Sequence, residues 1–105
     1  MIKKEVDKIA QKLKTVLQDA FDDFEGLYLF GSHAKENAAD ESDIDIVAVL
    51  DVLNREKFRS VLAIAAQFVY DYGVYIDMHP MTRKELEHNY IFHNEVVNKG
   101  IFYAI

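Results

Sequence analysis

Apolar side chains recur at spacings of three and four residues at the start of the chain, which predicts a helix over Met1–Phe24. The apolar positions are Ile2, Val6, Ile9, Leu13, Val16, Leu17, Ala20, Phe21 and Phe24. Lysines and acids fill the other face, so we expect this helix to cover a sheet rather than to bind a membrane or a partner helix. Gly26 is expected to end the helix and to turn the chain into a strand.

Two short apolar runs follow, and both are typical of buried strands. They are Leu27–Phe30 and Ile46–Leu50, each bounded by polar or turn residues. The segment between them, His33–Ser42, is polar and irregular. We expect a short helical turn after Ser32 and then a loop.

The pattern changes again in the second half of the chain. Asn54 is a good N-cap for a helix that Gly73 would end. Val74–Met78 is predicted to form a third strand, closed by Pro80.

The last quarter contains two more helix signals. Thr82, with Glu85 three residues later, can cap a short helix. His88–Lys99 predicts a last helix, and Ile101–Tyr103 a short strand or an extended tail. The order helix, strand, strand, helix, strand, helix predicts an α/β (α+β) fold, with a small mixed sheet flanked by helices, in one domain over residues 1–105.

Composition narrows the class of protein. Half of the 105 residues are hydrophobic and only one is proline, which argues against disorder. The net charge of -6 gives no sign of the basic face that long nucleic acids require. The absence of cysteine excludes disulfides and thiolate metal sites. No run reaches a membrane-spanning length, so we expect a cytoplasmic protein.

Two aspartates open the second strand. Asp43 and Asp45 are two residues apart, so on a strand they project to the same face with Cβ atoms roughly 7 Å apart. Both could simply cap the strand and face the solvent. However, charges on a packed face are costly unless they are paired or metal-bound, and carboxylates are the ligands that magnesium prefers. Two magnesium ions about 4 Å apart can hold both oxygens of a phosphoryl displacement.

Asp77 in the third strand is the candidate for a third carboxylate on this face. Alone, it could equally be a strand-end cap. Beside the first pair, we interpret it as a metal ligand that could also accept a proton from an attacking hydroxyl. His79 could orient Asp77, although we expect a structural or solvent-exposed role for this histidine, and His33 could touch a nucleotide.

Gly31 and Ser32 follow the first strand directly. Gly31 has no Cβ and would let a phosphate approach the backbone, while Ser32 offers a hydroxyl and an N–H group. The dipeptide gains its meaning from its position between a strand and the Asp-Ile-Asp sequence that opens the next one.

Gly31-Ser32-x-Ala34, then Ser42-Asp43-Ile44-Asp45, then a later strand aspartate resemble the minimal nucleotidyltransferases. These are small relatives of the polymerase-beta-like nucleotidyltransferase superfamily. The resemblance implies magnesium and transfer of NMP from an NTP, with ATP as the expected substrate. It makes the three aspartates metal ligands, and Gly31, Ser32, Lys35 and Ser42 contacts of the nucleotide.

The resemblance also implies a partner. Many such proteins pair with a small helical HEPN protein in toxin–antitoxin systems and silence it with AMP. This chain has Lys35 and Glu36 where the family usually has Arg-Gly, so the planar fork that contacts phosphate is lost.

Three functions remain open from the sequence. The chain could transfer AMP to a protein hydroxyl, neutralise a partner by contact alone, or modify a small molecule. The three aspartates favour catalysis, and the short chain leaves no second domain to bind a small acceptor.

Overall fold

The structure is a computed structural model, and it describes residues 3–35 and 42–105. Among these residues, the four strands form one sheet in the order β3-β2-β1-β4. β2 and β3 are parallel, and β1 is antiparallel to both β2 and β4. In chain order the elements are α1 (Lys4–Ala20), β1 (Phe24–Phe30), the 3-10 helix η1 (Gly31–His33), β2 (Ile44–Leu50), α2 (Arg55–Tyr72), β3 (Ile76–Thr82), α3 (Arg83–His88), α4 (Tyr90–His93), the π-helical η2 (Asn94–Asn98) and β4 (Ile101–Ala104).

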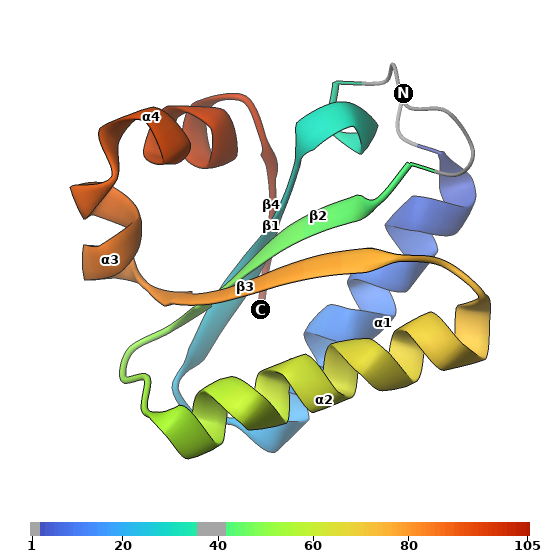
Figure 1. Cartoon of the computed structure of the whole chain (residues 1–105), viewed down its shortest axis with the longest axis horizontal. Helices are drawn as coiled ribbons and strands as arrows, with labels where there is room; N and C mark the ends of the chain where they lie inside the picture. Colours follow the sequence, from blue (N-terminus) through green and yellow to red (C-terminus); the bar gives the residue numbers. More distant parts are fainter. Residues whose placement is uncertain (1–2, 36–41) are drawn as a thin grey trace.

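Helices cover both faces of the sheet, so the predicted mixed fold is confirmed. α1 and α2 pack on one face, and α3, α4 and η2 lie on the other (Figure 1). Alternate residues of β2 serve the two cores: Ile46 and Ala48 face α1 and α2, whereas Val47 and Val49 pack with Leu86 of α3 and with η2. The larger core lies beneath α1 and α2, and the smaller core leaves room for the polar side chains at one end of its face.

The first helix buries most of the predicted apolar stripe but ends earlier than expected. Val16 and Ala20 of the stripe are exposed, and Ile2 lies outside the described residues. Phe21 is already extended, and Phe24 begins β1 rather than ending the helix. Phe24 is buried in the same core as the stripe, so its apolar character fits a helix and a strand equally well. Gly26 does not end the helix either. It lies inside β1 at φ +139°, where a Cβ would meet the Phe102 ring at 2.6 Å.

The caps predicted for the long helix are confirmed. The Asn54 side chain accepts a hydrogen bond from the backbone N–H of Lys57, and Gly73 adopts a left-handed conformation after α2. β2 begins at Ile44, one residue after Asp43, which the sequence placed at the opening of this strand. Ile44 pairs with Ile76 and donates its N–H to the Tyr75 carbonyl at 2.8 Å.

Pro80 lies inside β3 instead of closing it, so the third strand runs later than predicted. β3 is an edge strand, and an edge has a side on which no N–H group is needed. Thr82 and Glu85 form the predicted capping box at the start of α3. The last helical region begins at Tyr90 rather than His88, because Asn89 interrupts the helix and caps α4.

The chain end forms a strand, as the sequence suggested. β4 pairs with β1, and the Tyr103 hydroxyl donates to Asp7 Oδ1 of α1 at 2.8 Å. None of the helices in the described ranges has the length and apolarity needed to cross a bilayer.

Candidate active site

Two of the predicted carboxylates lie opposite each other on neighbouring strands. Asp45 of β2 pairs in register with Asp77 of β3, and Asp43 precedes β2 by one residue. Partial burial raises the pKa of Asp45 above its usual value, and the charges of Asp77 and Asp43 raise it further. His79 and His33 offset part of this rise. The charges of Asp77 and Asp43 therefore both act on the Asp45 carboxylate.

The turn after β1 closes directly onto Asp45. Phe30, the last residue of β1, pairs with Asp45, and Gly31 follows it at φ +75°. A Cβ on Gly31 would collide with the Asp45 carboxylate. Glycine is thus required here both by the backbone conformation and by the space that the carboxylate occupies. η1 forms the short helical turn that we expected after Ser32.

His33 is buried, with 4% of its surface exposed, and does not present its ring to the solvent. Its Nε2 donates to the Ser42 carbonyl at 2.9 Å, which joins the end of η1 to the residue before Asp43. The ring thus holds together the two ends of a segment whose residues 36–41, Glu36 included, lie outside the described part of the chain. Sequence spacing alone gave no signal for this contact.

Lys35 does not point at the carboxylates. Its Nζ pairs with Glu95 Oε2 of η2 at 3.0 Å, and Glu95 also pairs with Lys99 at 3.0 Å. These side chains are about one third to one half exposed, so the ion pairs are weak and either lysine can readily exchange Glu95 for another anion. Hydrogen bonds from Lys99 and Lys35, together with their charges, hold the pKa of the Glu95 carboxyl below its usual value.

His79 is the polar neighbour of Asp77. Its Nε2 lies 3.1 Å from Asp77 Oδ2, and its ring packs against those of Phe30 and Phe92. The sequence predicted a structural or solvent-exposed role, and the side chain is 37% exposed. The alternation of side chains on a strand had already placed His79 on the face of Asp77.

The side chains at this site are of the kind that binds magnesium, but they are not arranged around one ion. Asp43, Asp45 and Asp77 offer carboxylate oxygens, and their mutual repulsion would be relieved by a cation. Within residues 3–35 and 42–105, however, no three His, Asp or Glu side chains are arranged as ligands of one ion. Asp77 is turned toward His79 instead.

A hollow of about 710 Å³ opens on the other side of the sheet. His33, Ser42 and Ile44 line it together with residues of α1 and the end of α2. Since Ile44 belongs to the core under α1 and α2, this hollow does not face Asp45 and Asp77. The carboxylates lie instead on the open end of the opposite face, beside α4.

The fold and the site together define a class of protein. A small mixed sheet presents a glycine turn and adjacent carboxylates from neighbouring strands, a set of groups suited to a metal-bound nucleotide. The model of the family described as "Polymerase beta, Nucleotidyltransferase" matches residues 11–102. The chain therefore belongs to this nucleotidyltransferase family, and the resemblance found in the sequence is confirmed.

Proteins that are similar to this chain support the same family. A protein of Methanocaldococcus jannaschii, provisionally named a protein adenylyltransferase, is 31% identical over 97 residues, which cover 92% of this chain and 88% of the relative. A toxin–antitoxin structure with AMP-PNP has a TM-score of 0.68 and 21% identity, and covers 91% of this chain and 73% of its own.

A complex of the tri-AMPylated HEPN toxin of Shewanella oneidensis with its MNT antitoxin matches with a TM-score of 0.62. The identity is 18%, and the match covers 95% of this chain and 73% of that one. At these identities the likeness to the solved structures shows the fold.

Proposed function

We propose that this chain transfers AMP from ATP to a hydroxyl group of a partner protein, as the antitoxin of a HEPN-type toxin. The observation that carries the proposal is the register of β2 and β3, which sets Asp45 beside Asp77 next to the Gly31 turn. The name of the M. jannaschii relative and the AMPylated toxin bound to the S. oneidensis antitoxin support the choice of acceptor.

The reaction is a displacement at the α-phosphorus of ATP. The acceptor oxygen forms a bond to this phosphorus, the bond from it to the oxygen bridging to the β-phosphate breaks, and pyrophosphate leaves with the bonding electrons. The proton of the acceptor hydroxyl passes to Asp77, whose side chain is exposed, whereas that of Asp45 is half-buried. Magnesium, held by Asp43, Asp45 and Asp77, would supply charge neutralisation for the phosphates.

The nucleotide is held mainly by the turn after β1. Gly31 lets a phosphate approach the backbone, and Ser32 and Ser42 offer polar groups at the two ends of the intervening segment. Lys35 contacts the triphosphate once it exchanges Glu95 for phosphate. This exchange costs little because the pair is exposed, but it places one competing carboxylate beside the site.

Residues 1–105 are proposed to form a single minimal nucleotidyltransferase domain, acting in the cytoplasm, where ATP and the partner are available. Both ends of the described chain belong to one packed unit, because β4 pairs with β1 and Tyr103 is bonded to Asp7.

Intact-mass spectrometry of the partner tests the proposal. With magnesium and ATP, the wild type is expected to add AMP to its partner. Asp77→Asn keeps the size of the side chain and is expected to bind ATP and partner but to leave the partner mass unchanged. Asp51→Asn makes the same change on an exposed acid just beyond the other end of β2 and serves as the control.

Two outcomes would overturn the proposal. If the wild type binds the partner tightly and never modifies it with any NTP, neutralisation by contact is the correct function. If Asp77→Asn transfers AMP at the wild-type rate, Asp77 has been assigned the wrong role.

A further inference from the structure

The side chain of Asp77 has one hydrogen bond among the described residues, and His79 makes it. Nε2 of His79 lies 3.1 Å from Oδ2 of Asp77. An ionised carboxylate can only accept, so the ring nitrogen donates. Asp77 is 53% exposed, and without this bond its carboxylate would be free to rotate in water.

The His79 ring packs against two phenylalanine rings at one edge of the site. The ring centroid lies 5.8 Å from that of Phe30 and 5.6 Å from that of Phe92. Phe30 and Phe92 also contact each other edge to face, with centroids 5.3 Å apart. Three elements, β1, β3 and α4, thus contribute one ring each to an aromatic cluster. These contacts favour the observed position of the His79 ring, whose side chain stays 37% exposed on its other side.

The sheet fixes the other coordinates. Asp77 and His79 are two residues apart on β3 and pair with Asp45 and Val47 of β2. All four side chains therefore project from the same face. The His79 ring, packed against Phe30 and Phe92, thus donates to a carboxylate that lies directly beside Asp45.

We propose that His79 is a positioning residue that holds the Asp77 carboxylate in one orientation for the acceptor and its metal. The inference rests on the proposed AMP transfer, in which Asp77 takes the acceptor proton. Groups that orient a ligating or catalytic carboxylate typically contribute 10- to 100-fold to metal affinity or rate. The competing explanation is that His79 only packs against Phe30 and Phe92.

Two substitutions separate orientation from packing. His79→Phe keeps an aromatic ring against Phe30 and Phe92 but removes the donor. His79→Gln removes the ring but keeps an N–H donor at about the position of Nε2. We expect His79→Phe to lower the rate of AMP transfer about 10-fold with little change in the KM for ATP, and His79→Gln to recover most of that loss.

The control is His88→Phe, which removes an exposed histidine of α3 whose Nδ1 is bonded to the Lys84 carbonyl of its own helix. It should transfer AMP at the wild-type rate. In the Asp77→Asn background, where transfer is already lost, His79→Phe should not weaken manganese binding any further, because a residue that acts through the Asp77 carboxylate has nothing left to position.

Manganese binding without ATP gives a readout that needs no transfer. Titration followed by electron paramagnetic resonance should show binding about 10-fold weaker in His79→Phe than in the wild type, with recovery in His79→Gln. If the wild type transfers no AMP but His79→Phe still weakens manganese binding, the proposed reaction fails while the positioning role stands.

Other results would overturn the inference itself. One is wild-type transfer and manganese binding in His79→Phe. Another is a His79→Gln variant as impaired as His79→Phe, since only the phenylalanine keeps the packing and only the glutamine keeps the donor. A further weakening of manganese binding on adding His79→Phe to Asp77→Asn would show that His79 acts elsewhere.

Discussion

Gly31 lets the turn after β1 lie directly against the Asp45 carboxylate, in a space that the Cβ of any other residue would occupy. Its φ of +75° is strained for other residues, and a Cβ would collide with Asp45. Gly73 provides a natural comparison. It has a similar φ of +64° after α2, but a Cβ there would meet nothing within 4 Å.

Alanine at the two positions should therefore have different effects. Gly73→Ala should lower the free energy of unfolding by about 1–2 kcal/mol, the cost of the backbone conformation alone. Gly31→Ala should cost about 1 kcal/mol more and should abolish binding of a non-hydrolysable ATP analogue, because Asp45 must move. Urea denaturation and calorimetric titration measure the two effects. Equal stability losses with unchanged analogue binding would contradict the role given to Gly31.

Single residues of the site were predictable where strand geometry determined them. Asp43 and Asp45 share a face by spacing alone, and Asp77 needed only a neighbouring parallel strand. The pairing of Lys35 with Glu95 could not be predicted, because the partners are sixty residues apart and meet only when η2 packs beside the turn. The contact of His79 with Asp77 was within reach of the same spacing argument, but its aromatic neighbours come from two other elements.

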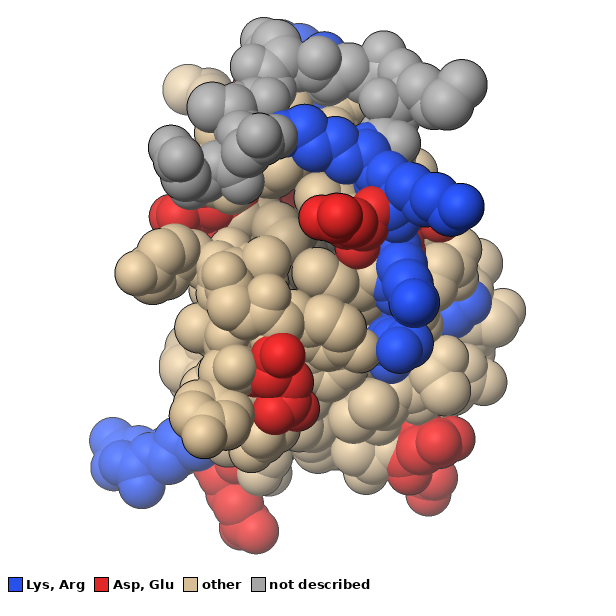
Figure 2. Space-filling view, turned by 90° about the vertical axis from the view of Figure 1, so that its right-hand side faces the viewer, with Lys and Arg blue, Asp and Glu red and all other residues tan. Residues whose placement is uncertain are grey.

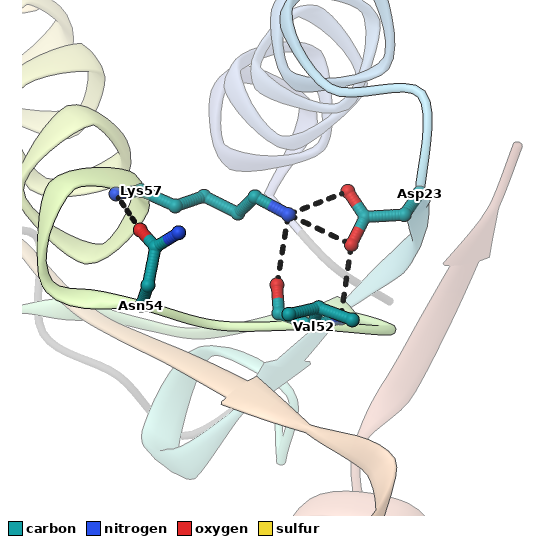
Figure 3. Close-up of polar contacts among 4 residues, drawn as sticks. All are labelled: Asp23, Val52, Asn54 and Lys57. Atoms are coloured by element: carbon teal, nitrogen blue, oxygen red, sulfur yellow. Dashed lines mark hydrogen bonds and ion pairs between the residues drawn. The ribbon is translucent and has the colours of Figure 1, made fainter.

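At the scale of elements, one ion pair fastens the start of β1 to the connection between β2 and α2. Lys57 Nζ lies 3.0 Å and 2.9 Å from the two carboxylate oxygens of Asp23 and 2.8 Å from the Val52 carbonyl (Figure 3). The Val52 N–H also donates to Asp23 Oδ2 at 2.9 Å. Burial alone would raise the pKa of Asp23, but the bonds from Lys57 and Val52 outweigh it and lower the pKa.

Asp23→Asn should consequently destabilise the protein by about 1–2 kcal/mol at neutral pH, since it breaks a charge-assisted network only about one quarter exposed. A lowered folded-state pKa means that this stabilisation is present above the usual value of 3.8 and is lost as the pH falls through the folded value. The difference between wild type and variant should thus shrink in acid. Asp22→Asn, on the exposed neighbour, is the control. A difference that stays constant from neutral pH to acid would refute the network.

Caps were predicted better than strand limits, for a physical reason. Asn54, Gly73 and Thr82 act through their own chain neighbours, so sequence is enough. The limits of β1 and β3 depend instead on partners. Gly26 stays within β1 because Phe102 of β4 packs over it, and Pro80 stays within β3 because that strand is at the edge.

At the scale of the whole molecule, the net charge of -6 hides a local basic band. α1 carries Lys4, Lys8 and Lys12 at spacings of four residues, so they share a helix face. Figure 2 shows this side of the molecule, where lysine and arginine side chains gather beside scattered acids. The sequence had shown no basic face. α1 covers the sheet face opposite Asp45 and Asp77, but Lys8 lines the same hollow as Ser42, so one end of the band adjoins the proposed nucleotide site.

The carboxylates at the end of the sheet carry a stability cost that their ligand should reverse. Burial and like charges disfavour the ionised form of Asp45, so part of the folding free energy is lost to keeping these groups together. Sites shaped for function commonly show this trade-off between stability and activity. Whether substituting these aspartates raises or lowers the free energy of unfolding should then depend on whether ligand is present.

Without ligand, the double variant Asp43→Asn/Asp45→Asn should accordingly have a higher melting temperature than the wild type. Its free energy of unfolding should be larger by about 0.5–1 kcal/mol, because repulsion around Asp45 is removed. Magnesium with ATP should stabilise the wild type by about 2.7 kcal/mol at one hundred times the dissociation constant, and should not stabilise the variant. Scanning calorimetry with and without both ligands measures the four states, and Asp51→Asn should behave as the wild type throughout. An equal ligand-induced rise in wild type and double variant would show that magnesium and ATP do not bind at these aspartates.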